Sequence, residues 1–170
     1  GIMALLDVLK EQDLEEDTLL ILLADHGTSL TENNIFFEHH GLYDCTTHIP
    51  MIMRWPGRLP AAKRLKSMYQ MTDIGPTLLD AVDLPIPSEM EGQSFYKQIF
   101  GKDAQVNSDS FIVSSECTWQ AKWSLRTNRY KFILSRENGL EGGPERELYD
   151  LLVDPMEENN IATNTPSFTV

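Results

Sequence analysis

The uninterrupted run of large apolar residues from Leu19 to Leu23 constrains the fold of this chain more than any other stretch. Such a run is typical of a strand covered on both faces, like a central strand of a parallel sheet. Asp25, His26 and Gly27 follow directly after Ala24. Because ligands of open α/β sheets bind beyond the carboxyl ends of the strands, the pattern predicts that Asp25 and His26 lie at a binding site.

A second polar motif, at residues 36–41, contains His39 and His40, two of the four histidines in the chain. Carboxylate and imidazole groups are both ligands of divalent cations. A polar strand end or a surface loop would explain either motif alone, but the recurrence of histidines favours a site. Gly27, in the first motif, allows the chain to turn sharply or to adopt a positive φ.

These motifs belong to an ordered series of short segments. The series comprises Ala24–Gly27, Phe37–Asp44, His48–Gly57, Asp73–Asp80, Gly92–Phe95, Arg126–Ile133, Glu147–Leu151 and Asp154–Glu157. Each segment is weak alone, but together they cover nearly the whole chain. In order and spacing the series resembles the sulfatase family, the alkaline-phosphatase-like hydrolases of sulfate esters. The resemblance is to the C-terminal part of such a protein.

The resemblance implies an α/β fold class in two parts. Residues 1–100 would be the C-terminal part of a sulfatase-like α/β/α sandwich, and residues 101–170 a small antiparallel-sheet α+β subdomain. The residues support this division, because 101–109 is a polar linker and short alternating strands are predicted beyond it. A helical pattern at residues 2–12, followed by the strand, forms half of a βαβ unit, so a parallel sheet is expected to begin before Gly1.

The remaining elements are predicted from periodicity and turn residues. They are a loop at residues 28–46, a strand at 47–55, a helix from Thr72 or Asp73 to about Asp83, a short helix at 94–100, and strands at 111–115, 122–127, 129–135 and 148–151. Asn128 is expected to form a tight hairpin turn. Trp123 and Leu125 would share one face of their strand, and residues 148–151 would form an edge strand.

The formal net charge of −12 argues against a nucleic-acid-binding surface and against a polybasic membrane patch. No apolar stretch approaches the length of a membrane-spanning helix. An anionic substrate would therefore need a local positive centre, such as a metal ion with histidines.

Cys45 and Cys117 are too few for a disulfide scaffold and are expected to be buried, unreactive thiols. A periplasmic or secreted location is implied only by the usual location of members of the sulfatase family.

The resemblance places Asp25 and His26 at the two C-terminal ligand positions of the family's metal site. One divalent cation is expected, and Ca²⁺ is the first expectation on family grounds. Many relatives have Asn where this chain has His26, and imidazole suits Mn²⁺, Zn²⁺ or Fe²⁺ better than an amide does. The alternative is that His26 contacts the anionic oxygens of the substrate.

The resemblance also makes His39 the candidate catalytic residue. Relatives place a Lys or His there, which contacts a sulfate oxygen or protonates the leaving group, and a histidine suits either role near neutral pH. His39 and His40 are both candidate substrate-binding residues. Because neighbouring loop side chains usually point apart, only one is expected to face the metal, and His39 is favoured. His48 is expected to be structural, and Glu38 and Asp44 to orient the imidazoles through ring N–H hydrogen bonds.

The family's nucleophile is a formylglycine made from Cys or Ser at the start of a Cys (or Ser)-x-Pro-Ser-Arg motif. Neither Cys45 nor Cys117 begins that motif. The expectation is therefore a sulfatase segment that requires the N-terminal part of its own chain and is inactive and poorly stable alone. Sugar, aryl and choline sulfates all remain possible substrates. The alternatives are a phosphonate monoester hydrolase, phosphodiesterase or phosphoglycerol transferase of the same superfamily, and a degenerate binding module without activity.

Overall fold

The computed structural model describes residues 1–100, 110–118, 120–137 and 143–162. The chain divides into two compact units, one combining residues 1–23 with 51–107 and the other residues 24–50 with 108–170. Residues 24–50, which carry every candidate site residue, thus group with the C-terminal strands. The predicted linker at 101–109 lies outside the described residues. No helix in the described part of the chain is long and apolar enough to cross a membrane.

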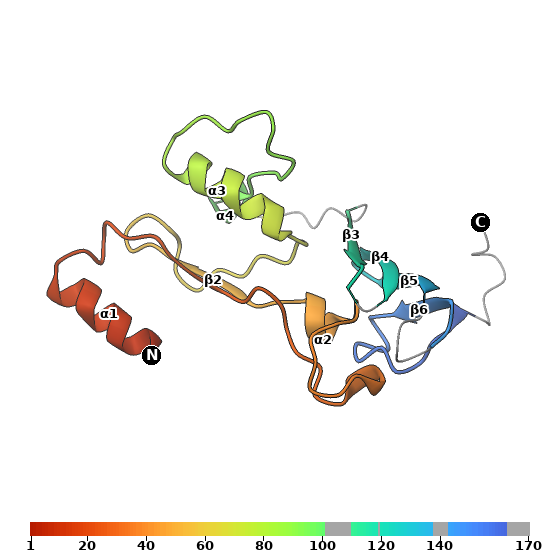
Figure 1. The fold of residues 1–170 in the computed structure, drawn as a ribbon. Helices are drawn as coiled ribbons and strands as arrows, with labels where there is room; N and C mark the ends of the chain where they lie inside the picture. Colours follow the sequence, from red (N-terminus) through yellow and green to blue (C-terminus); the bar gives the residue numbers. More distant parts are fainter. Residues whose placement is uncertain (101–109, 119, 138–142, 163–170) are drawn as a thin grey trace. The chain divides into compact units, whose positions relative to one another are not determined.

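The first unit begins with α1, Ile2–Glu11, which confirms the predicted N-terminal helix. β1, Leu20–Leu23, pairs with β2, Met51–Arg54, so that Leu22 lies opposite Ile52 (Figure 1). This pairing is antiparallel, whereas the parallel neighbours expected from before Gly1 stay a prediction. Leu22 and Ile52 are 40% and 60% exposed, because the described residues supply only two strands to this sheet and a two-stranded ribbon leaves apolar side chains uncovered.

The two helices predicted between residues 72 and 100 are present in the same unit. A 3-10 turn at Met71–Asp73 leads into α3, Ile74–Ala81, and α4, Tyr96–Phe100, follows. The Asp73 carboxylate accepts hydrogen bonds from the backbone N–H groups of Gln70 and Gln93, both at 2.8 Å. This side chain therefore ties the start of α3 to the segment that precedes α4.

The second unit contains the predicted antiparallel sheet (Figure 1). Its strands, in spatial order, are β3, Phe111–Glu116, β4, Ala121–Thr127, β5, Tyr130–Glu137, and β6, Arg146–Asp150. β6 lies at one edge, as expected, and a tight turn joins β4 to β5. In that turn the Thr127 hydroxyl accepts a hydrogen bond from the Tyr130 N–H at 2.9 Å, a local bond that favours turns.

The covered face of this sheet is unusually polar. Lys122, Lys131 and Glu147 are all buried there beside Ile133, whereas Trp123 and Leu125 lie on the opposite face and are 41% and 42% exposed. Strand periodicity reveals that two faces alternate, but not which one is covered. Because charged residues are seldom buried without partners, the polar face indicates that charged groups from elsewhere in the unit meet it.

The core of the second unit joins this sheet to the candidate site region. Ile35, Leu42 and Tyr43 pack with Ile133 and Tyr149 in one buried cluster. The predicted loop at 28–46 is partly helical, with a 3-10 turn at Glu32–Asn34 and the short helix α2, Asp44–Thr47. The strand expected from residue 47 accordingly begins later, at the start of β2. Residues 24–47 are therefore held against the sheet rather than extending as a free loop.

Candidate metal and substrate site

Asp25 lies two residues beyond the end of β1, and its side chain is 87% exposed. Its Oδ1 accepts a hydrogen bond from the backbone N–H of His26 at 3.0 Å. This hydrogen bond is the main cause that lowers the pKa of Asp25 below its ordinary value. The carboxylate is therefore ionised at neutral pH, which is the form that binds a cation.

His26 is oriented by its own backbone neighbour. Its Nδ1 lies 2.8 Å from the carbonyl oxygen of Gly27, and because a carbonyl only accepts hydrogen bonds, this contact places the proton on Nδ1. The other ring nitrogen, Nε2, lies 3.7 Å from Asp25 Oδ2. A hydrogen bond to a backbone carbonyl is the usual way in which a ligating histidine is held in the correct tautomer.

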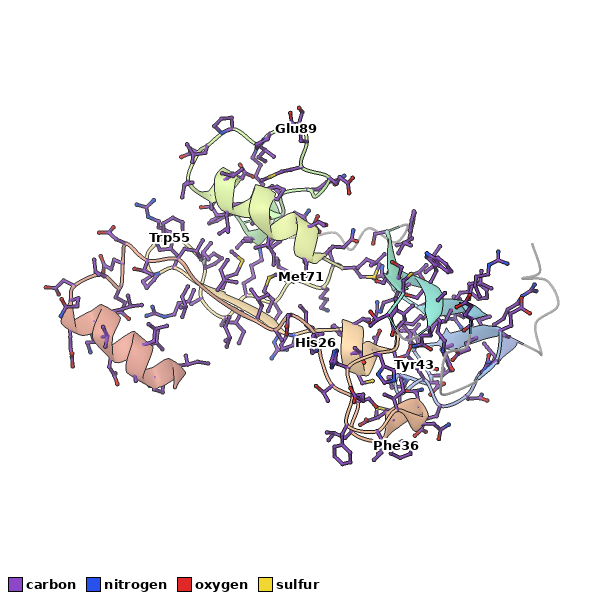
Figure 2. The ribbon with its side chains drawn as sticks, viewed as in Figure 1. His26, Phe36, Tyr43, Trp55, Met71 and Glu89 are labelled. Carbon is purple, nitrogen blue, oxygen red and sulfur yellow. The ribbon has the colours of Figure 1, made fainter. Side chains whose placement is uncertain are left out.

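His39 stacks on His26, with ring centroids 4.4 Å apart and an angle of 18° between the planes. The two motifs meet because Ser29 and Glu38 form an antiparallel bridge, with backbone hydrogen bonds of 2.9 and 3.2 Å. The structure thus brings together Asp25, His26 and His39. Figure 2 shows His26 close to α2 and Phe36 at the far tip of the intervening loop.

The other predicted imidazole contacts do not form hydrogen bonds. His39 Nδ1 lies 3.9 Å from Glu38 Oε2, and His48 Nδ1 lies 3.7 Å from Asp44 Oδ2, both beyond hydrogen-bond distance. His40 is half-buried, next to His39 in the loop. Asp44 binds other partners, Arg126 and Lys131, so the orienting role predicted for it is wrong.

The donor set suits part of a metal site. Asp25 and His26 offer one carboxylate and one imidazole side by side. In the part of the chain that the structure describes, no group of three or more His, Cys, Asp or Glu side chains could hold a metal ion. Divalent cations take four or more ligands. Asp25 and His26 by themselves could therefore supply only part of the ligands that such a cation needs.

A buried ionic cluster centred on Asp44 lies in the same unit. Arg126 donates to both Asp44 carboxylate oxygens, at 2.8 and 3.0 Å, and Lys131 Nζ lies 2.5 Å from Asp44 Oδ1 and 2.9 Å from Glu157 Oε1. Burial by itself raises the pKa of both carboxyl groups. For Asp44 the Arg126 hydrogen bonds and the Lys131 charge outweigh burial and lower the pKa to about 2, whereas burial leaves the pKa of Glu157 raised.

Sequence reasoning missed this cluster, and it also missed the buried Glu147, which accepts hydrogen bonds from Tyr43 and Tyr149. The signal in the sequence is the presence of charged residues inside strand patterns, Lys131 within β5 and Glu147 within β6. Periodicity alone does not tell whether such charges face solvent or partners. Their partners lie 87 and 104 residues away along the chain, at Asp44 and Tyr43.

The lowered pKa of Asp44 predicts a specific acid sensitivity. The ionised carboxylate stabilises the fold above about pH 4, and this stabilisation is lost as the pH falls from the ordinary pKa of 3.8 toward 2. Asp44→Asn is expected to cost about 2 kcal/mol of unfolding free energy at pH 7 and less at pH 3. Urea unfolding from pH 7 to pH 3 measures both. Asp154→Asn is the control, and an equal cost for Asp44→Asn at both pH values would contradict the prediction.

Comparison with known proteins places this chain in a class. The chain matches the family described as N-sulphoglucosamine sulphohydrolase, C-terminal, over residues 32–169, and its relatives are sulfatases of the alkaline-phosphatase-like superfamily. The chain belongs to this C-terminal sulfatase family.

Two relatives illustrate the similarity. Arylsulfatase K of Canis lupus familiaris is 31% identical over 169 residues, which is 95% of this chain and 31% of that protein. Delta 4,5-hexuronate-2-O-sulfatase of Bacteroides thetaiotaomicron is 30% identical over 156 residues, covering 86% of this chain and 31% of that protein. The chain thus spans about a third of the length of these relatives.

Solved structures agree on the fold. A 2-O GAG sulfatase is 25% identical, with a TM-score of 0.77 over 96% of this chain and 35% of that one. A protein solved in complex with its substrate D-glucosamine-2-N,6-O-disulfate is 23% identical, with a TM-score of 0.82 over 97% of this chain and 34% of that one. Both matches confirm the predicted fold class, a mixed α/β chain that corresponds to the C-terminal portion of sulfatase structures.

Proposed function

We propose that this chain is the C-terminal part of a metal-dependent sulfatase that hydrolyses sulfate esters of saccharides. Asp25 and His26 would bind one divalent cation, with Ca²⁺ as the first expectation and Mn²⁺ or Zn²⁺ as alternatives. His39 would contact a sulfate oxygen or protonate the leaving alcohol, and His40 would line the substrate side of the same loop. The observation that carries the proposal is the stacked His26–His39 pair beside the ionised Asp25.

The chemistry of these groups fits sulfate-ester hydrolysis. A bound cation would neutralise negative charge on the sulfate oxygens. His39 is 61% exposed, so it can both reach a substrate and exchange protons with solvent. Histidine is the side chain best suited to donating a proton to a leaving alcohol near neutral pH.

The nucleophile would come from outside this chain's described residues. Cys45 is half-buried and Cys117 is exposed, and both are free thiols. The prediction that both cysteines are buried is therefore wrong for Cys117. Because neither begins the family's nucleophile motif, the chain would need the N-terminal part of a longer protein, and residues 1–170 alone are expected to show no sulfatase turnover.

A saccharide substrate is favoured over other alcohols by the names of the similar proteins, which include a hexuronate sulfatase and a 2-O GAG sulfatase. The test is sulfate release by the full-length protein from sulfated monosaccharides and disaccharides, with an aryl sulfate alongside. Release from the aryl sulfate alone would contradict a saccharide substrate. Release of the alcohol from phosphonate monoesters or phosphodiesters, without sulfate release from sulfate esters, would assign the protein to the phosphoryl branch of the superfamily.

Replacement of His39 by Asn tests its role directly. His39→Asn is expected to reduce kcat by about 100- to 10,000-fold, the range for loss of a general acid or base. His48→Asn is the matched control, because the His48 side chain is also exposed, at 72%, and its imidazole makes no hydrogen bond to the Asp44 carboxylate. The control is expected to keep kcat within about twofold, since exposed sites tolerate such changes. Equal losses in both variants would remove His39 from the proposed site.

A further inference from the structure

The segment Gly41–Thr47, which includes α2, joins the candidate site to the four-stranded sheet. Three carboxylates hold this segment, two from the sheet and one, that of Glu157, from the segment that follows β6. The Gly41 N–H donates to Glu116 Oε2 at 2.8 Å, the Tyr43 hydroxyl to Glu147 Oε2 at 2.6 Å, and the Asp44 N–H to Glu157 Oε2 at 2.5 Å. The segment is thus attached at three of its residues by directional bonds.

The same segment contacts both site motifs. His39 and His40 immediately precede Gly41 in the chain. At the other end, the carbonyl oxygen of Thr46 accepts a hydrogen bond of 2.7 Å from the N–H of Gly27, the neighbour of His26. Figure 2 shows His26 and Tyr43 near α2. A shift of the 41–47 segment would therefore move the His26 and His39 rings relative to each other.

Lys131 occupies the centre of these attachments. Its side chain is 1% exposed, and its ammonium group bridges Asp44 Oδ1 and Glu157 Oε1. Buried ion pairs contribute little net stability compared with apolar residues of similar size, because desolvation offsets much of the attraction. What a bridge between two carboxylates does provide is a defined position for the groups it joins.

We propose that the four-stranded sheet positions the two site motifs through the 41–47 segment, with Lys131 as the positioning residue. This inference rests on the proposed function, because it assigns Lys131 to the geometry of the same site. Lys131 does not touch the substrate. It holds Asp44 and, through Glu157, the first turn of α2, and so keeps the stacked pair of His26 and His39 beside Asp25.

The test compares two substitutions in the full-length protein. Lys131→Met removes the buried ammonium group while keeping an unbranched side chain. Arg129→Met, two residues away, removes the exposed ion pair with Asp150 and leaves the contacts of the 41–47 segment intact. Lys131→Met is expected to lower kcat by about 10- to 100-fold, because small misplacements of reacting groups have effects of this size. KM should change less than about threefold, since misplacement weakens the transition state more than the bound substrate.

Normalising kcat to the folded fraction, measured by circular dichroism in the same samples, separates positioning from stability. A purely stabilising Lys131 would leave kcat per folded molecule unchanged, and that result would overturn the proposal. If Lys131→Met does not fold, Glu157→Gln serves instead, because it keeps an oxygen acceptor for the Asp44 N–H. A smaller fall in kcat is then expected, and an unchanged kcat would again overturn the proposal.

Histidine-selective NMR distinguishes failure of this inference from failure of the proposed function. If the wild-type protein hydrolyses no sulfate ester, the proposed function fails, but the geometry can still be measured. Lys131→Met should shift the imidazole resonances of His26 and His39, because ring-current effects depend on the separation of stacked rings, while Arg129→Met should not. Unshifted resonances in Lys131→Met would overturn the positioning role whether or not the protein is active.

Discussion

Asp25→Asn in the full-length protein is expected to reduce kcat/KM for sulfate-ester hydrolysis by about 10³-fold, the size of the loss when a key electrostatic group is removed. The substitution keeps an oxygen at the same place but removes the negative charge that attracts a cation. Sulfate release and the bound metal content of the purified protein measure the two effects together. Because the Asp25 side chain is 87% exposed, the thermal unfolding temperature should match that of the wild type when both proteins are measured with a chelator, which removes the stabilisation by bound metal.

Asp17→Asn is the control for Asp25→Asn. Asp17 is also exposed, and its replacement should leave kcat/KM and metal content unchanged. Excess Ca²⁺, Mn²⁺ or Zn²⁺ should partly restore the Asp25 variant, and the ion that restores it most at the lowest concentration identifies the preferred metal. Full activity of Asp25→Asn with normal metal content would rule out a metal-binding role for Asp25.

Gly27→Ala is expected to have a comparably large effect for a steric reason. A Cβ at Gly27 would lie far inside van der Waals distance of the Cys45 carbonyl oxygen and 3.2 Å from Thr46 Cα. Both contacts are with backbone atoms, so Gly27 or α2 must move. We expect a loss of about 1–3 kcal/mol of unfolding free energy and a fall of about 100-fold in kcat, because His26 is the preceding residue.

Gly75→Ala provides the matched control for the glycine substitution. A Cβ at Gly75 meets only the Met90 side chain, at 3.6 Å, which is ordinary contact. Gly75 lies within α3, where alanine is favoured over glycine by about 0.5–1 kcal/mol, so this variant should be as stable as the wild type or more stable. Urea unfolding and sulfate release measure both variants. Wild-type kcat in Gly27→Ala would show that α2 does not hold the His26 motif.

The structural reason for a glycine at position 27 differs from the one that the sequence indicates. The sequence indicates a sharp turn or a positive φ, yet Gly27 does not have a positive φ, unlike Gly41. The requirement at Gly27 is the close approach of α2. Close approach depends on where a later segment of the chain packs, and a single residue type in a sequence does not distinguish it from a conformational requirement.

The sequence by itself determined the elements that depend on local periodicity. These are α1, α3, α4 and the strands β3 to β6, and also the two motifs that carry Asp25, His26 and His39. Apolar spacing and turn residues act within a few positions along the chain, so they can be read without knowing the fold. The resemblance to the sulfatase family also predicts the fold class, and the comparisons with known proteins confirm that fold class.

Only the tertiary structure decided which strand pairs with β1 and which face of the four-stranded sheet is covered. The apolar run of β1 indicates burial but carries no information about its partner, which is the antiparallel β2. On the sheet, Lys131 and Glu147 are buried because Asp44 and Tyr43, far away in the sequence, supply their hydrogen-bond partners. Burying a charge is favourable only when such partners are present, and their presence is a property of the assembled chain.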